Sequence, residues 1–222
     1  NLIKKAADGA QPGYKYNDAD DQDFARKVAA NSMVLLKNDG VLPLKKGSKI
    51  AVIGELARKP RYQGAGSSHI NPTQLDNGLD ELKKLGFNVE FAQGYELSKK
   101  KAKNNDSLIG QAAALAAKCE TAVLFIGLTD EYEAEGFDRT HMNLPEAHDK
   151  LVGEVLKVNK NVVIVLAGGS PVEMPWSDDV AAILNSYLGG QAGAGAVADI
   201  LSGAVNEVLR FHHTNRLSVC CQ

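Results

Sequence analysis

The sequence has few cysteines, and they follow no pairing pattern. Cys119, Cys220 and Cys221 are the cysteines among 222 residues, and their spacing gives neither a disulfide framework nor a set of zinc ligands. His212 and His213 lie near the C-terminal cysteine pair, but adjacent ligand pairs fit tetrahedral zinc geometry poorly. We therefore expect no metal site and a reducing location such as the cytoplasm.

An excess of one charge and long apolar runs are also lacking. The chain has 25 Lys and Arg against 27 Asp and Glu, a net charge of −2, so no basic field favours nucleic acid. No apolar run approaches the roughly 20 residues of a membrane span, and no secretion signal is visible. We expect no nucleic-acid partner, no membrane insertion and a cytoplasmic location.

The remaining composition is that of an ordinary globular domain. Hydrophobic residues make up 44% and charged residues 23%, which is typical of soluble proteins. Residues 1–19 are polar and aperiodic, and we interpret them as a linker or arm. Residues 20–206 carry regular apolar patterns and form the predicted domain. Residues 207–222 have neither clear period nor turn signals, and we interpret them as an atypical tail, either a truncated boundary or appended foreign sequence.

Strand and helix patterns alternate through the predicted domain. Strands are predicted at 49–54, 88–94, 121–127, 161–169 and within 179–190, and helices at 21–38, 73–86, 106–119, 144–159 and 192–203. The strands are continuous Val, Ile and Leu runs, which indicates burial on both faces. The alternation predicts an α/β fold: a mostly parallel, doubly wound sheet with helices on both faces, a three-layer α/β/α sandwich.

A long acidic loop, residues 128–144, follows the third predicted strand. Its charged residues are Asp130, Glu131, Glu133, Glu135, Asp138 and Arg139. Ligands of such sheets bind beyond the carboxyl ends of the strands, and connections are usually only roughly 2–6 residues long. Crowded carboxylates raise each other's pKa, and a protonated carboxyl is what a general acid requires. The alternative is a solvated loop without function.

A second segment, "RYQGAGSSHINP", forms a glycine-serine loop, residues 61–72. Gly64 and Gly66 let the backbone approach a ligand, and Ser67 and Ser68 offer hydrogen bonds. No Lys-Ser/Thr pair follows the glycines and no third glycine completes a dinucleotide fingerprint, so phosphate-binding motifs are excluded. A plain turn is the alternative.

A third segment, "AGGSPVEMPW", ends the fourth predicted strand at residues 167–176. It contains the sole tryptophan, Trp176. Flat aromatic rings suit carbohydrates, but a single tryptophan belongs more often to a core or an interface, and we predict that structural role.

Together these segments resemble the α/β-sandwich domain of glycoside hydrolase family 3, the β-glucosidase family. The resemblance covers residues 20–206 and rests on "ARKVAANSMVLLKNDGVLPL", "KIAVIG", "YQGAGSS", "EYEAEGFDRTHMNLP", "VVIVLAGGSPVEMPW" and "LGGQAGAGAVADILSGAVN". It implies a retaining, exo-acting β-glycosidase whose active site lies between two domains. A (β/α)8-type barrel would supply an Asp nucleophile, and the sandwich domain would supply the general acid/base Glu. The implied substrate is a β-linked glucoside or oligosaccharide, with no cofactor.

The resemblance also implies roles for single residues. Glu131 is the first choice for the general acid/base, Glu135 the second and Glu133 the third. Ser67 is expected to contact substrate, and Ser68 is the weaker choice. Asp138 and Arg139 are expected to pair with each other or to hold the loop.

The sequence departs from the family pattern, because no segment resembles the barrel. One carboxyl group without its partner cannot carry out double displacement, so we predict that this chain alone is inactive. An apolar face exposed by the missing barrel favours self-association. The alternatives are a non-catalytic carbohydrate-binding module and a flavodoxin-like nucleotide-binding domain, and the missing phosphate motifs count against the latter.

Overall fold

The computed structural model describes residues 2–9, 15, 17–67, 69–98, 103, 105–205 and 209–210. The helices are α1 (Leu2–Asp8), α2 (Asp18–Ser32), α3 (Gly78–Lys84), α4 (Asn105–Ala116), α5 (Glu146–Leu156) and α6 (Gly193–Ser202), with a 3-10 turn at Glu55–Ala57. The strands are β1 (Val34–Asn38), β2 (Lys49–Ile53), β3 (Asn88–Ala92), β4 (Thr121–Gly127), β5 (Val162–Ala167), β6 (Ala182–Asn185) and β7 (Leu209–Arg210).

The strands form a single mostly parallel sheet in the order β3-β2-β4-β5-β6-β1-β7. The five strands β3, β2, β4, β5 and β6 are parallel neighbours. Strand β1 runs antiparallel to β6, and β7 pairs parallel with β1. The carboxyl ends of the parallel strands therefore meet at one edge, which is where loops after β2, β4, β5 and β6 emerge.

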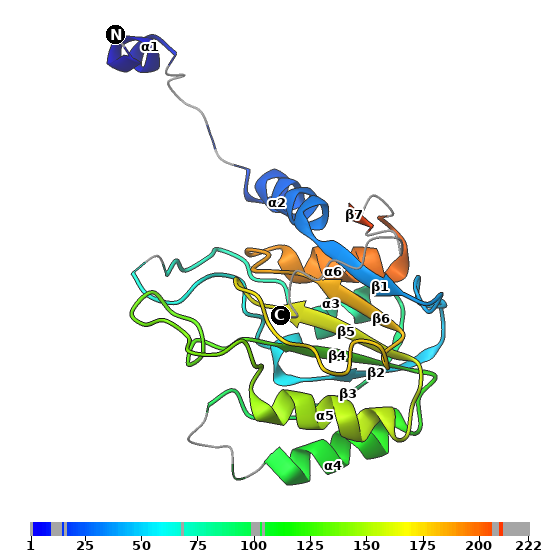
Figure 1. Cartoon of the computed structure of the whole chain (residues 1–222). Helices are drawn as coiled ribbons and strands as arrows, with labels where there is room; N and C mark the ends of the chain where they lie inside the picture. The colour runs from blue at the N-terminus through cyan, green and yellow to red at the C-terminus, as the bar shows by residue number, and fades with distance from the viewer. Residues whose placement is uncertain are drawn as a thin grey trace.

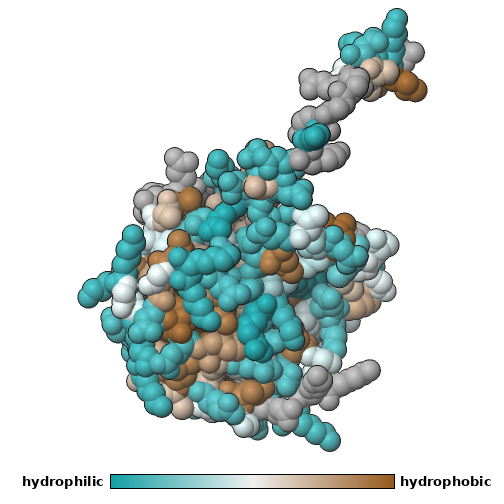
Figure 2. All heavy atoms as spheres, turned by 180° about the vertical axis from the view of Figure 1, so that it is seen from behind, coloured by the Kyte–Doolittle hydropathy of each residue, from teal (hydrophilic) through white to brown (hydrophobic). Residues whose placement is uncertain are grey.

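Helices cover both faces of this sheet. Figure 1 shows α4 and α5 on one face and α2, α3 and α6 on the other. All residues of β4 are buried, as are all but the last residue of β5, because helices lie above and below these strands. The predicted three-layer α/β/α sandwich is confirmed. Seen from behind, the surface is mostly hydrophilic with small apolar areas between polar side chains (Figure 2).

The predicted helix at 21–38 is wrong in its second half. Helix α2 ends at Ser32, and Met33 has extended backbone angles. Residues Val34–Asn38 form β1, whose residues pair with β6. The apolar residues of this segment fit a helical spacing, but pairing with an edge of the sheet buries them better than continuing the helix into solvent.

At each end of the chain, the structure describes only some of the residues. The N-terminal arm contains the short helix α1, which the aperiodic sequence did not predict and which buries none of its residues. Residues 206–208 and 211–222, which include His212 and Cys220, lie outside the described residues. Within the part of the chain that the structure describes, no helix combines the length and the apolar character needed to cross a membrane.

The end of β4 is held so that the acidic loop leaves it in a fixed direction. A side chain at Gly127 would place its Cβ 1.9 Å from the carbonyl oxygen of Ala167, so the two backbones approach as only glycine allows. The buried His148 accepts a hydrogen bond at Nδ1 from the Gly127 N–H, at 3.3 Å. The Tyr95 hydroxyl donates to the carbonyl of Phe125 and lies against the His148 ring.

Candidate functional site

Loops from neighbouring strands meet at the carboxyl edge of the sheet. The glycine-serine loop follows β2, and the acidic loop follows β4; Figure 1 shows both, in cyan and in green, on the same side of the sheet. The Glu135 N–H donates to the carbonyl of Ala65, at 3.1 Å, and joins the two loops directly. The Glu173 N–H donates to the carbonyl of Met142, at 2.9 Å, and joins the acidic loop to the segment after β5.

Glu135 is the carboxylate that reaches the glycine-serine loop. Its Oε2 accepts one hydrogen bond from the Ser67 backbone N–H, at 2.7 Å, and another from Ser67 Oγ, at 2.6 Å. Both residues are exposed. They lie on the surface formed by the glycine-serine loop and the acidic loop at the carboxyl ends of the strands, which we call the loop edge. A candidate acid and a candidate substrate contact, distant in sequence, thus lie together.

Gly66 makes room for that carboxylate. Its φ is +119°, and a Cβ at this position would lie 2.6 Å from Glu135 Oε2 and 2.7 Å from Glu135 Cβ. Any L side chain here is strained by the backbone angle and also displaces Glu135. The glycine is therefore required by both the turn and the close approach of the acidic loop.

Glu133 is tied to the scaffold instead. Its Oε2 accepts a hydrogen bond from the Gly169 N–H, at 3.0 Å, and lies 3.4 Å from Arg61 Nη2. The same Nη2 donates to the Glu133 backbone carbonyl, at 2.7 Å. Glu133 therefore joins segments that follow β2, β4 and β5, which suits a structural link better than proton transfer.

Glu131, the first choice from the resemblance, contacts a different part of the edge. Its Oε1 accepts a hydrogen bond from Ser98 Oγ, at 2.9 Å, and Ser98 lies in the loop after β3. Glu131 thus points to the β3 side of the sheet, whereas Glu135 points to the glycine-serine loop. Ser68, the weaker substrate contact, lies outside the described residues.

Arg139 holds the loop, and it does so without Asp138. Its Nη2 donates to the carbonyl of Pro171, which links the acidic loop to the segment after β5. Within the described residues, Asp138 and Arg139 form no ion pair with each other. Of the two roles expected for this pair, the structure shows the loop contact.

The expectation that crowding raises carboxylate pKa values is wrong for Glu135. The two hydrogen bonds from Ser67, first that of the hydroxyl and then that of the backbone, lower the pKa of Glu135 below its ordinary value. Both bonds favour the ionised form. Four acidic side chains of the loop have polar partners: Asp130 and Glu133 share Arg61, Glu131 has Ser98, and Glu135 has Ser67.

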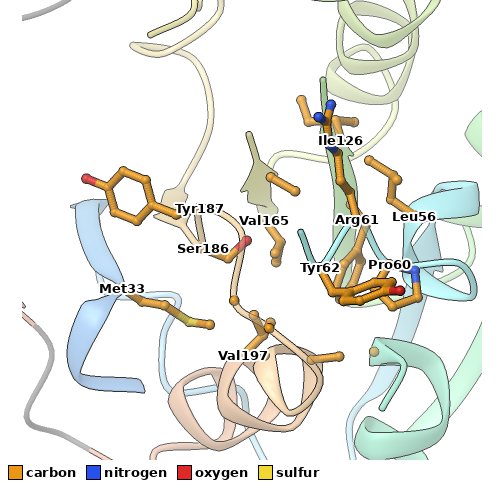
Figure 3. Close-up of a pocket in the computed structure, with 17 residues that line it drawn as sticks. Met33, Leu56, Pro60, Arg61, Tyr62, Ile126, Val165, Ser186, Tyr187 and Val197 are labelled. Atoms are coloured by element: carbon orange, nitrogen blue, oxygen red, sulfur yellow. The ribbon is translucent and has the colours of Figure 1, made fainter. Parts of the chain in front are cut away.

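A small cavity lies beneath the loop edge. Figure 3 shows Arg61 and Tyr62 on one side of it, Ser186 and Tyr187 on another, and Val197 of α6 at its base. Its volume is about 40 Å³, enough for a few water molecules and far below the roughly 300–1,000 Å³ of small-molecule pockets. It is too small for a sugar ring or a nucleotide, so the candidate site is the open loop edge above it.

Trp176 has the structural role that the sequence predicts. The residue is 5% exposed, and its Nε1 donates to Asp149 Oδ1 on α5, at 2.8 Å. Burial raises the pKa of Asp149, and the bond from Trp176 opposes that shift. The ring is therefore committed to packing and is not presented to a ligand.

No group of three or more His, Cys, Asp or Glu side chains is placed to hold a metal ion in the described ranges.

Sequence reasoning gave no role to Arg61, although it begins the glycine-serine loop. In the sequence, Arg61 is a single arginine just before a glycine-rich turn, and the acidic residues occur about 70 positions later. That signal is too common to be recognised without the tertiary contacts.

Comparison with known proteins identifies the family. The sequence model described as "Glycosyl hydrolase family 3 C-terminal domain" matches residues 33–210. This chain belongs to that family. Thermostable beta-glucosidase B of Acetivibrio thermocellus is 49% identical over 209 residues, which are 92% of this chain and 27% of that protein.

Other relatives carry different names. An exo-alpha-(1->6)-L-arabinopyranosidase of Bifidobacterium longum is 40% identical and covers 87% of this chain and 27% of its own length. The crystal structure of the GH3 beta-glucosidase of Bifidobacterium adolescentis superimposes with a TM-score of 0.85 at 40% identity, covering 92% of this chain and 30% of that one. The chain spans about a quarter of the curated relatives it matches, and it is the C-terminal domain type of β-glucosidase-like enzymes.

Proposed function

We propose that this domain supplies the general acid/base carboxyl group of a retaining, exo-acting, β-glucosidase-like glycoside hydrolase. The observation that carries the proposal is the contact between Glu135 and Ser67 at the carboxyl edge of the sheet. It presents a carboxyl group on the open side of a loop that is fixed at several points, and general acid catalysis needs a proton donor held in a defined place.

Among the three loop glutamates, the geometry favours Glu135 over the first choice from the sequence. Glu133 is occupied by Gly169 and Arg61, and its side chain is 21% exposed. Glu131 binds Ser98 on the β3 side. Glu135 is exposed beside the serine expected to contact substrate. Glu131 remains the alternative, and the experiment below separates the two.

A lowered pKa for Glu135 is the opposite of what a general acid needs, and we propose that a partner domain reverses this shift. In a retaining enzyme the nucleophilic carboxylate lies about 5–5.5 Å from the acid. A like charge at that distance disfavours ionisation and raises the pKa of the acid. In this proposal the barrel domain brings that carboxylate and excludes water, so Glu135 becomes a proton donor only in the assembled site.

The partner would dock on the loop edge. Exposed apolar side chains occur on the loops there: Ile70 after β2, Phe137 in the acidic loop and Tyr187 after β6. An apolar edge rimmed by polar residues is typical of an interaction surface, and in the isolated chain it favours self-association.

We propose a β-linked glucoside or oligosaccharide as substrate. A relative that is 40% identical is named an exo-alpha-(1->6)-L-arabinopyranosidase, and we propose that the partner domain contributes most of the sugar specificity.

The experiment uses the chain alone and a hybrid enzyme. The 222-residue chain should not hydrolyse a chromogenic aryl β-glucoside. A hybrid in which residues 33–205 replace the matching segment of the Acetivibrio thermocellus enzyme should hydrolyse it. Glu135→Gln should then reduce kcat of the hybrid by about 10²–10⁴-fold, and Glu133→Gln and Glu131→Gln should reduce it less. Turnover by the chain alone that is lost in Glu131→Gln or Glu135→Gln would refute the need for a partner.

A further inference from the structure

Arg61 is a buried cation placed directly behind the acidic loop. Its side chain is 4% exposed, although it lies on a loop beyond the end of β2. Its Nη2 donates to the Glu133 carbonyl, at 2.7 Å, and its Nε lies 3.6 Å from Asp130 Oδ1. Neither Nε nor Nη1 has a hydrogen-bond partner. Burying guanidinium N–H groups without hydrogen-bond acceptors lowers the stability of the fold. This cost suggests a role of Arg61 beyond packing.

Three contacts join the two loops, and they follow the same order along both loops. Arg61 binds Glu133, the Ala65 carbonyl accepts from the Glu135 N–H, and Ser67 binds the Glu135 carboxylate. Arg61 forms the innermost contact, nearest the sheet, and it is the buried one. The outer contacts, at Ala65 and Ser67, are closer to solvent and are weaker anchors because water competes for the same hydrogen-bonding groups.

The chemistry of arginine explains why this residue suits the task. Its planar fork can bind a main-chain carbonyl and face two carboxylates at once, whereas a lysine ammonium is a point charge on a flexible chain. Asp130 and Glu133 lie on either side of the bend with which the acidic loop begins. Their attraction to one buried cation fixes the direction in which the following residues, including Glu135, continue.

We propose that Arg61 is a positioning residue, which fixes the acidic loop against the glycine-serine loop and so holds the Glu135 carboxylate at Ser67. The catalytic meaning of this placement rests on the proposed function, but the placement itself can be tested without activity. Within the described residues, the hydrogen bond and ion pairs of Arg61 go to Glu133 and Asp130 and not to Ser67 or Glu135, so it acts through the backbone of Glu133.

The test follows the Ser67 amide by NMR in the 222-residue chain. Replacing Glu135→Gln changes the acceptor of that amide, and the resulting shift in its proton resonance reports the contact. The same shift is then measured in an Arg61→Gln background. Arg58→Gln is the matched control, because Arg58 lies on the same segment but pairs with Glu55.

We expect the Glu135-dependent shift of the Ser67 amide to fall by more than half in Arg61→Gln and to be retained in Arg58→Gln. If Arg61→Gln does not fold, Arg61→Lys keeps the charge, and the shift should still fall there. An undiminished shift in the folded Arg61 variant, or an equal loss in Arg58→Gln, overturns the proposal. An inactive hybrid enzyme with the expected NMR result would instead count against the proposed function.

Discussion

Ser67 places its backbone N–H and its hydroxyl on the same carboxylate oxygen of Glu135, at 2.7 and 2.6 Å. This contact joins the loops that follow β2 and β4, which are neighbours in the sheet. It also sets the protonation of the proposed acid, because both donors favour the ionised form. The bonds from Ser67 therefore lower the pKa of Glu135 and favour its ionised form.

Removing the Ser67 hydroxyl should raise the pKa of Glu135 toward its ordinary value. Ser67→Ala removes the larger of the two causes of the lowered pKa and keeps the backbone donor. Because the folded-state pKa is depressed, the contact stabilises the fold above the unfolded-state pKa, and this contribution is lost as pH falls through the folded-state pKa. Carboxyl ¹³C titration by NMR measures the change. Ser98→Ala, which removes a donor to Glu131, should leave the titration of Glu135 unaltered; an equal shift in both variants would contradict this.

Gly66→Ala should displace Glu135 and destabilise the domain by about 1 kcal/mol or more, since the backbone has a positive φ. The added Cβ would lie 2.6 Å from Glu135 Oε2. Gly64→Ala is the control, because a Cβ there meets no atom within 4 Å and should change stability by only about 0.5 kcal/mol. Urea unfolding compares the two variants. Equal stability would mean that the loop adjusts without loss and that the close approach is unimportant.

Gly127→Ala should disturb the pairing of β4 with β5, where Gly127 lies opposite Ala167. Its Cβ would lie 1.9 Å from a backbone oxygen, and we expect a loss of about 1–3 kcal/mol or more in the free energy of unfolding. Gly153→Ala, inside α5 where a Cβ meets no neighbour, should instead gain about 0.5–1 kcal/mol. Denaturant melts of both variants decide the matter, and a stable Gly127→Ala protein would show that the description of this strand end is wrong.

His148 should make the domain less stable in mild acid. Burial lowers its pKa from 6.5 to about 3, so the unfolded chain binds a proton between these values and the folded chain does not. Stability then falls as pH drops from about 6.5 toward 3, by about 2 kcal/mol between pH 7 and pH 5. Urea melts at both pH values should show that His148→Gln removes this part of the pH dependence, whatever it does to stability at pH 7. The same pH dependence in both proteins would contradict a neutral, buried His148.

The sequence predicted the central elements because their patterns are local. The run of Val, Leu and Ile in β4 gave bounds of 121–127 that agree with the structure, since continuous apolar residues indicate a strand covered on both faces. Strand β1 was missed because its residues also fit the helical spacing of α2. The choice between helix and strand was made there by pairing with β6, a contact that no local pattern reports.

The meeting of the two loops could be predicted from the sequence, and the residue contacts between them could not. Topology alone brings the loops after β2 and β4 to one edge, so the meeting of the acidic loop with the glycine-serine loop could be expected. Which glutamate meets Ser67 depends on how the acidic loop bends, and that bend is set by Arg61 and Gly169 through Glu133. These contacts link distant segments, and no spacing in the sequence encodes them.

The most direct measurement is the leaving-group dependence of the hybrid enzyme that carries Glu135→Gln. A general acid matters most for a leaving group that needs a proton and little for one such as dinitrophenolate, which leaves unaided. We predict a large loss of kcat/KM with phenyl β-glucoside, a much smaller loss with 2,4-dinitrophenyl β-glucoside, and no such contrast for Glu131→Gln. Equal losses with both substrates in Glu135→Gln, or the contrast appearing only in Glu131→Gln, would contradict the assignment of the proton donor to Glu135.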